Sequence, residues 1–172
     1  MSLKSTTKTG ILLLLLPLFA LAQQNDPPTA YPAMVGDISF DPKTDKTDFQ
    51  LCYKQIAQYF NYGDGLEYEG EKAAIEKEFS NKYQPEMLKN ETGLIRIRFV
   101  VNCKGETDRF RLMGMDENYN EKEFPASITE QLLNITKNLK GWKIKKYKEY
   151  PIDYYQYLIF KIENGQLKEI LP

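Results

Sequence analysis

The chain has 172 residues and contains no histidine, which is both the commonest metal ligand and the commonest general base in proteins. Its two cysteines cannot complete a structural zinc site on their own. The Walker, G-x-S-x-G and G-x-G-x-x-G patterns are also missing. We therefore expect neither an enzyme nor a resident metal or cofactor. Neighbouring carboxylates such as Glu67 and Glu69, or Glu76 and Glu78, leave a small glycan-active enzyme as a distant alternative.

Arginine is sparse as well. The net charge is −1 and only four arginines occur, a balance that argues against general nucleic-acid binding. With 42% apolar and 27% charged residues, the chain has enough apolar side chains to form a core.

The first 22 residues have the pattern of a secretory signal peptide. Lys4 and Lys8 precede a short apolar run, 11–21, and Ala20-Leu21-Ala22 fits a small-x-small cleavage site. The run is shorter than the ~20 residues that a membrane helix needs, although an uncleaved anchor remains the alternative. We expect export, no retained transmembrane segment, and a mature chain that begins at Gln23.

Export bears on the two cysteines, Cys52 and Cys103. An even pair in an oxidising compartment predicts a disulfide, and the alternative is two free buried thiols. The bridge would tie the region before the main domain to the turn of a predicted hairpin.

That hairpin spans Gly93–Leu112. Period-two alternation with β-branched and aromatic residues predicts two strands, joined by Asn102-Cys103-Lys104-Gly105. With these four residues as the loop, the register pairs Val101 with Glu106, Phe99 with Asp108, Ile97 with Phe110, and Ile95 with Leu112.

The same register pairs Arg98 with Arg109 and Arg96 with Arg111, so all four arginines share one face of the hairpin. Like charges directly opposed destabilise a sheet, and something must compensate them. One hypothesis is an anionic ligand or acidic partner held by the guanidinium groups. The other is internal pairing with Glu or Tyr side chains of a neighbouring strand.

Other segments have simpler patterns. The aspartates of residues 35–48 predict a solvated acidic loop. Helices are expected at 49–62, at 71–82 and from Phe124 to Leu139, the last with a capping box at Ser127–Glu130 and a stop at Gly141. The basic stretch 142–150 fits either a strand or a solvated loop. Strands are expected at 154–163 and 166–171 around Asn164-Gly165, a strong hairpin signal.

The landmarks together resemble the TonB C-terminal domain family. They are Phe79, Tyr83, Pro85-Glu86, the run 93–102, Lys104-Gly105-Glu106, Gly141-Trp142 and the strand 157–162. The resemblance implies a periplasmic location and recognition of a peptide by strand addition to a sheet edge, as the family does with outer-membrane transporters. This chain lacks the family's long Pro-rich arm and retained anchor, and has Gln84 inside the Tyr-Pro motif and Lys143-Ile144 after the tryptophan.

The sequence thus predicts an α+β protein with helices on one face of an antiparallel sheet. Its expected parts are a signal peptide (1–22), a leader and accessory region (23–70) and a TonB C-terminal-like domain (71–172). The expected function is that of an exported, periplasmic protein-interaction module, possibly linked to outer-membrane transport, whose partner is a cell-envelope protein or peptide. The alternative function is binding of an acidic envelope ligand through Arg96, Arg98, Arg109 and Arg111.

Overall fold

The structure is a computed structural model that describes residues 36–53, 55–58, 66–85, 88 and 90–171. All of them belong to the second of the chain's two units, Pro32–Pro172. The predicted signal peptide lies outside the described residues, and the predicted boundaries at residues 22 and 70 stay predictions. Among the described residues, no helix is long and apolar enough to cross a membrane.

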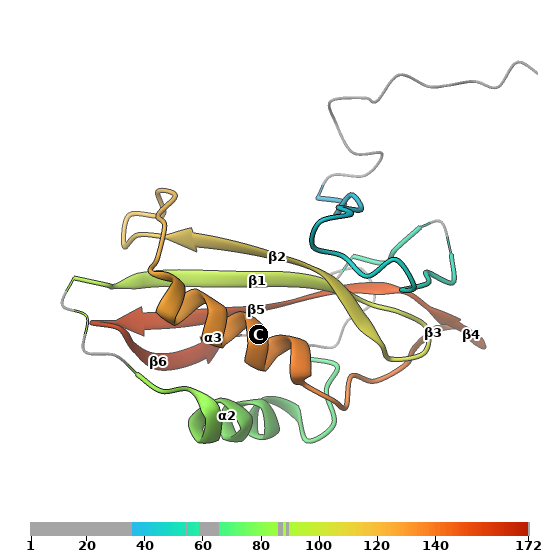
Figure 1. Ribbon diagram of the computed structural model, residues 1–172. Helices are drawn as coiled ribbons and strands as arrows, with labels where there is room; N and C mark the ends of the chain where they lie inside the picture. Colours follow the sequence, from blue (N-terminus) through green and yellow to red (C-terminus); the bar gives the residue numbers. More distant parts are fainter. Residues whose placement is uncertain (1–35, 54, 59–65, 86–87, 89, 172) are drawn as a thin grey trace, which may run out of the picture. The chain divides into compact units, whose positions relative to one another are not determined.

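The predicted α+β class is confirmed: in the part of the chain that the structure describes, four antiparallel strands form the main sheet and two helices accompany it (Figure 1). The sheet order is β2-β1-β5-β6. A second, two-stranded sheet pairs β3 with β4. The strands are β1 (Gly93–Val101), β2 (Thr107–Met115), β3 (Lys145–Tyr147), β4 (Tyr150–Ile152), β5 (Tyr154–Glu163) and β6 (Gln166–Leu171).

Helices α2 (Glu71–Lys82) and α3 (Ala126–Asn138) cover one face of this sheet, as predicted (Figure 1). The apolar side chains that alternate along β1 and β5 point toward them, which explains why these strands are hydrophobic at every second residue. Phe79 of α2 packs on Phe160 of β5, with 4.8 Å between ring centroids. The most buried members of this core are Ile75, Phe79, Ile95, Ile97, Phe99, Val101, Leu132, Phe160 and Ile162.

The opposite face of the sheet is partly covered by a covering segment, defined here as the described residues between Gly36 and Gln58. Ile38 and Ile56 of this segment form a second, smaller core with Val100 and Tyr155. The predicted leader and accessory region therefore includes residues that pack on the sheet.

Where the sequence predicts a helix at 49–62, none of the described residues from Phe49 to Gln58 is helical, and this prediction is wrong. Backbone groups of this segment instead form hydrogen bonds with β5 and with the residue just before it, Asp153. Ala57 donates to the Asp153 carbonyl and accepts from Tyr155, each at 2.9 Å. The end of the predicted helix, 59–62, lies outside the described residues.

The register of the β1–β2 hairpin also differs from the prediction. Ile97 lies opposite Leu112, Arg98 opposite Arg111, and Val101 opposite Thr107. The turn is shorter than expected, because the backbone N–H of Asn102 donates to the carbonyl of Glu106 at 2.9 Å and leaves a loop of Cys103–Gly105.

A β-bulge supplies the rest of the difference. The register shifts between Arg98 and Val100, where Arg109 has a φ of 58°. The shorter turn and the bulge each move the register by one residue. Because side chains alternate with a period of two, the two displacements together leave the residues beyond the bulge on their predicted face, whereas Asp108, between the turn and the bulge, lies opposite Val100 and not opposite Phe99.

The remaining elements follow their patterns with small differences. Helix α2 has the predicted bounds, and Asn164 and Gly165, with φ of 51° and 80°, form the predicted hairpin turn. Helix α3 begins at Ala126 after Pro125 and has no side-chain cap, so the predicted capping box is wrong. The helix ends at Asn138, before the predicted stop at Gly141. The basic stretch after Trp142 forms β3 and its turn into β4.

Candidate functional site

Strand β6 forms one edge of the main sheet, because β5 lies on one side of it and no described strand lies on the other (Figure 1). The opposite edge, β2, is partly protected. It carries the bulge at Arg109, Lys122 donates its N–H to the carbonyl of Gly114 at 3.0 Å, and Met115 bridges to Glu121. Bulges and covering loops are devices by which proteins block strand addition. The two edges therefore differ in how readily they can accept a strand.

A groove of about 400 Å³ lies between β6 and α2. Phe79 and Tyr83 of the helix side and Leu167 and Ile170 of the strand give it apolar walls. The Tyr83 hydroxyl donates to the carbonyl of Gly165 at 2.9 Å, which ties the end of the helix to the β5–β6 turn. The groove therefore runs along the sheet edge and has walls from both elements.

Leu167 and Ile170 lie three residues apart and nevertheless both contribute to the main core. The reason is a register shift in the β5–β6 pairing, where Lys161 lies opposite Glu169 and Ile162 opposite Leu167. This pairing leaves Lys168 as an additional residue on β6.

On the other face of the sheet, the structure places the four predicted arginines beside the covering segment, but the predicted pairs are wrong: Arg98 lies opposite Arg111 and Arg96 opposite Met113. Arg111 holds Asp45 of the covering segment with two parallel hydrogen bonds of 2.7 Å, and also donates to the carbonyl of Ser39 at 2.7 Å. Arg98 lies 4.0 Å from the centre of the Tyr155 ring and donates to Gln58 at 3.0 Å and to the carbonyl of Gly36. Both guanidinium groups are thus occupied by groups of the same chain.

The other two arginines are bound less tightly. Arg109 donates to the carbonyl of Ile38 at 3.4 Å. Arg96, which lies opposite Met113, contacts the sulfur of that residue at 3.8 Å. It borders a cavity of about 500 Å³ whose walls include Phe40 and Met113.

Electrostatics at this face follow from the Asp45–Arg111 pair. The hydrogen bonds from Arg111 lower the pKa of Asp45 from 3.8 to about 2, and the same bonds raise the pKa of Arg111. Burial has the opposite effect on Arg98, whose pKa it lowers, and burial also raises the pKa of the Tyr155 phenol. The Asp45 side chain is only 1% exposed, so the acidic loop predicted for residues 35–48 is not wholly solvated.

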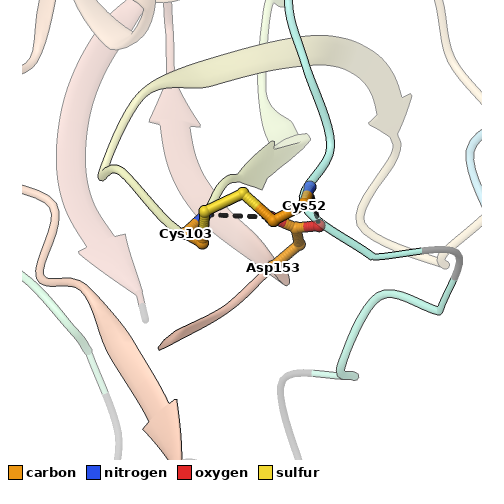
Figure 2. Close-up of side chains that lie close together, drawn as sticks. All are labelled: Cys52, Cys103 and Asp153. Carbon is orange, nitrogen blue, oxygen red and sulfur yellow. Dashed lines mark hydrogen bonds between the residues drawn. A yellow bond between two sulfur atoms is a disulfide. The ribbon is translucent and has the colours of Figure 1, made fainter. Parts of the chain in front are cut away.

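The predicted disulfide between Cys52 and Cys103 is confirmed, with 6.1 Å between the Cα atoms (Figure 2). It links the covering segment to the β1–β2 turn. Asp153, which is fully buried, lies beside it and accepts backbone N–H groups from both cysteines, at 2.7 Å from Cys52 and 2.8 Å from Cys103. It also accepts from Tyr53 at 2.9 Å. One carboxylate thus joins three segments of the chain.

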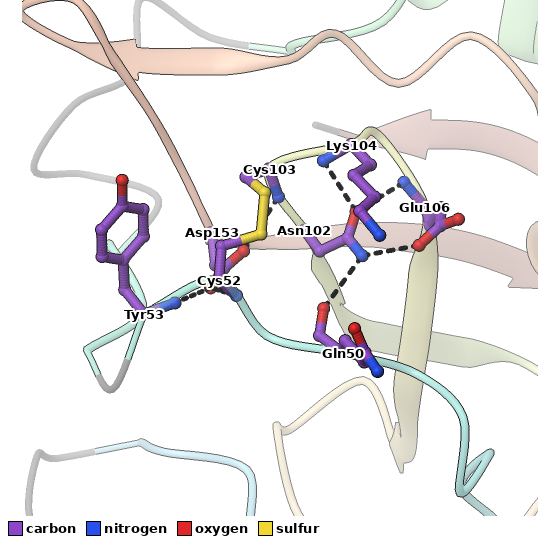
Figure 3. The surroundings of a disulfide bond; sticks show 8 residues. All are labelled: Gln50, Cys52, Tyr53, Asn102, Cys103, Lys104, Glu106 and Asp153. Carbon is purple, nitrogen blue, oxygen red and sulfur yellow. Dashed lines mark hydrogen bonds between the residues drawn. A yellow bond between two sulfur atoms is a disulfide. The ribbon is translucent and has the colours of Figure 1, made fainter.

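Asn102 extends this arrangement on the other side of the turn (Figure 3). Its side-chain oxygen accepts from the N–H groups of Lys104 and Glu106, each at 2.9 Å, and its amide donates to the carbonyl of Gln50 at 3.1 Å. An asparagine side chain that bonds to the backbone two residues further along favours such a turn.

The sulfur atoms of Cys52 and Cys103 and a carboxylate oxygen of Asp153 lie within 4.8 Å of one another. Metal binding by cysteine requires thiolates, and here both sulfurs are consumed by the disulfide. A buried carboxylate next to the sulfurs also disfavours a thiolate, because two negative charges would lie close together. The arrangement therefore fits a structural disulfide better than a reactive one.

Sequence reasoning did not find several of these residues. Asp45 is one aspartate among four in residues 35–48, and no local signal distinguishes it. Asp153 follows the short strand β4 and has no motif around it. The groove could not be located because its two walls, α2 and β6, are about ninety residues apart in the chain.

No family model, no curated protein and no solved structure matches this chain. The resemblance to the TonB C-terminal domain family therefore stays a prediction from the sequence.

Proposed function

We propose that this protein is an exported, non-enzymatic interaction module, which binds an extended peptide segment of a cell-envelope protein along β6. The observation that carries the proposal is the position of β6 at the sheet edge, next to an apolar groove. Main-chain groups of such an edge supply affinity for an added strand, and pockets for alternate side chains supply specificity.

The groove defines the chemistry of the bound segment. A strand added to β6 would direct alternate side chains toward α2, against Phe79 and Tyr83. These positions favour apolar residues. At the rim, Glu76 and Ser80 are exposed and would meet the polar side chains between them.

The absence of histidine and of nucleophile motifs from the sequence supports binding rather than bond chemistry. Strand addition is also the mode of recognition that the TonB-like resemblance implies. Export and a periplasmic location rest on residues 1–22 and belong to the same proposal.

The alternative, an acidic ligand on the arginine face, receives less support from the geometry. Asp45 already occupies Arg111, and Arg98 stacks on Tyr155 and bonds within the chain. An added anion would have to displace these groups. Arg96 borders the same cavity as Arg98 and Arg111, and among the described residues it bonds to the sulfur of Met113.

The test is capture of a partner from an envelope extract, followed by binding of its peptide to three forms of the protein. Ser80→Trp places a large side chain in the groove, whereas Lys77→Trp places the same side chain on the exposed surface of the same helix, outside the groove. We expect Ser80→Trp to abolish peptide binding and Lys77→Trp to leave it unchanged. Amide hydrogen exchange should show new protection at 166–171 and none along β2.

Equal binding by both tryptophan variants would contradict a site between β6 and α2. Turnover of a substrate by a preparation that retains no partner would contradict the whole proposal.

A further inference from the structure

A short ribbon, β3 and β4 with their turn, joins α3 to β5 and concentrates positive charge. Residues 143–150, KIKKYKEY, contain four lysines and one glutamate, a net charge of +3 in a chain whose overall charge is −1. Lys145 forms an ion pair with Glu67 at 3.1 Å and lies near the Tyr154 ring. These contacts connect the start of the ribbon to the rest of the fold. The other three lysines are exposed.

The outer part of the ribbon presents large apolar side chains. Tyr147 and Tyr150 lie directly opposite each other in the register, next to the turn Lys148-Glu149. They are 50% and 68% exposed, and Ile144 is 51% exposed. Residues opposed in an antiparallel pair share a face, so the two tyrosines form one aromatic tip.

The β1–β2 turn lies beside this ribbon and adds to it. A Cβ atom on Gly105 would lie 3.8 Å from the Cγ1 atom of Ile144, which places the turn against that side chain. Lys104, in the same turn, is exposed. Figure 1 shows β3 and β4 at the end of the main sheet where this turn lies.

Exposed lysines around tyrosine and isoleucine side chains match the surface of an anionic bilayer. Lysine is attracted by acidic headgroups, and tyrosine favours the boundary between headgroups and acyl chains. A protein partner would require a shaped surface around the tip, whereas a bilayer requires only charge and apolar side chains that project. We propose that the β3–β4 ribbon is a peripheral docking site for an anionic lipid membrane.

This site is separate from the groove at β6, so either proposal can fail without the other. It would hold the protein at a membrane surface and leave β6 available for a peptide.

The test uses the protein without its first 22 residues, and vesicles of phosphatidylcholine with or without phosphatidylglycerol, in a ratio of about 2:1. Co-sedimentation should show binding to the anionic vesicles and much weaker binding to the neutral ones, with a loss at ~0.5 M salt because surface charges are then screened. Lys146→Gln with Lys148→Gln should weaken binding about 25-fold, since each lysine near an anionic surface contributes roughly fivefold. The matched control, Lys43→Gln with Lys77→Gln, changes the net charge equally at exposed positions elsewhere and should bind as the unaltered protein does.

Tyr147→Ser with Tyr150→Ser separates a bilayer from a soluble polyanion. We expect this variant to bind anionic vesicles much more weakly, and the binding that remains to keep its salt dependence. Equal binding to neutral and anionic vesicles, or unchanged binding by the Lys146 and Lys148 variant, would overturn the proposal. Binding of polyglutamate that both tyrosine substitutions leave intact, together with no vesicle binding, would overturn it in favour of an acidic protein partner.

Discussion

Replacement of Asp45 by asparagine should remove an ion pair that holds the covering segment to the sheet. Arg111 lowers the pKa of Asp45 from 3.8 to about 2, and each pKa unit corresponds to ~1.4 kcal/mol. The charged form of Asp45 therefore contributes about 2 kcal/mol to the free energy of unfolding at neutral pH. The amide of asparagine is similar in size, so the substitution leaves no cavity.

The dependence on pH has a definite sign. Because the pKa is lower in the folded state than in the unfolded state, the stabilisation is present above about pH 5 and is lost as the pH falls toward 2. By the same relation, about half of it remains near pH 3. The difference in stability between the two proteins should therefore shrink in acid.

Urea unfolding followed by circular dichroism, at several values from about pH 2 to pH 7, measures this difference. Asp48→Asn is the matched control, since Asp48 is an exposed aspartate of the same segment, and its substitution should change stability by less than ~0.5 kcal/mol. If the unaltered protein and Asp45→Asn lose stability in parallel between about pH 5 and pH 2, the Asp45–Arg111 ion pair does not stabilise the folded state.

Three further predictions concern the parts that hold this fold. Replacing both Cys52 and Cys103 by serine opens a loop with a sequence separation of 51 and should lower the free energy of unfolding by about 4 kcal/mol; the urea midpoint of this variant should not respond to dithiothreitol, whereas that of the unaltered protein should fall. Gly114→Ala puts a Cβ atom 2.2 Å from the carbonyl oxygen of Lys122 and should cost about 1–3 kcal/mol in a thermal melt, and unchanged stability would contradict that close approach. Burial raises the pKa of the Tyr154 phenol, so the stability it contributes is present below about pH 10 and is lost as the pH rises; Tyr154→Phe should show a shallower alkaline loss of stability in urea, and an identical loss would refute the assignment.

Much of the fold is determined by local patterns in the sequence. Apolar and polar residues alternate along Gly93–Val101 and Tyr154–Glu163 because every second side chain of a strand faces the core. Both runs are strands, as this pattern predicts. Asn164-Gly165 supports its turn because both residues adopt a positive φ at low cost. Helical spacing also predicts α2 (Glu71–Lys82) correctly, because apolar residues that recur with the period of a helix all face the core.

The register of the first hairpin shows where local pattern stops being sufficient. Alternation determines which face a residue takes, but not which residue lies opposite it. Here Asn102 shortens the turn through its side-chain hydrogen bonds, and Arg109 adds a bulge in a conformation that few non-glycine residues adopt. The short turn and the bulge each depend on one residue, and a pattern averaged over many residues does not predict such effects.

What only the tertiary structure decides is which distant residues meet. Two cysteines behind the pattern of an export signal were enough to predict their bridge, because two cysteines allow only one pairing within the chain. The partners of the arginines were not predictable, since any of the chain's acidic or tyrosine residues would have fitted. Asp45 meets Arg111 because the covering segment packs on the sheet, and the groove exists because α2 lies beside β6. Contacts of this kind arise from the folding of the whole chain, and no short stretch of sequence carries them.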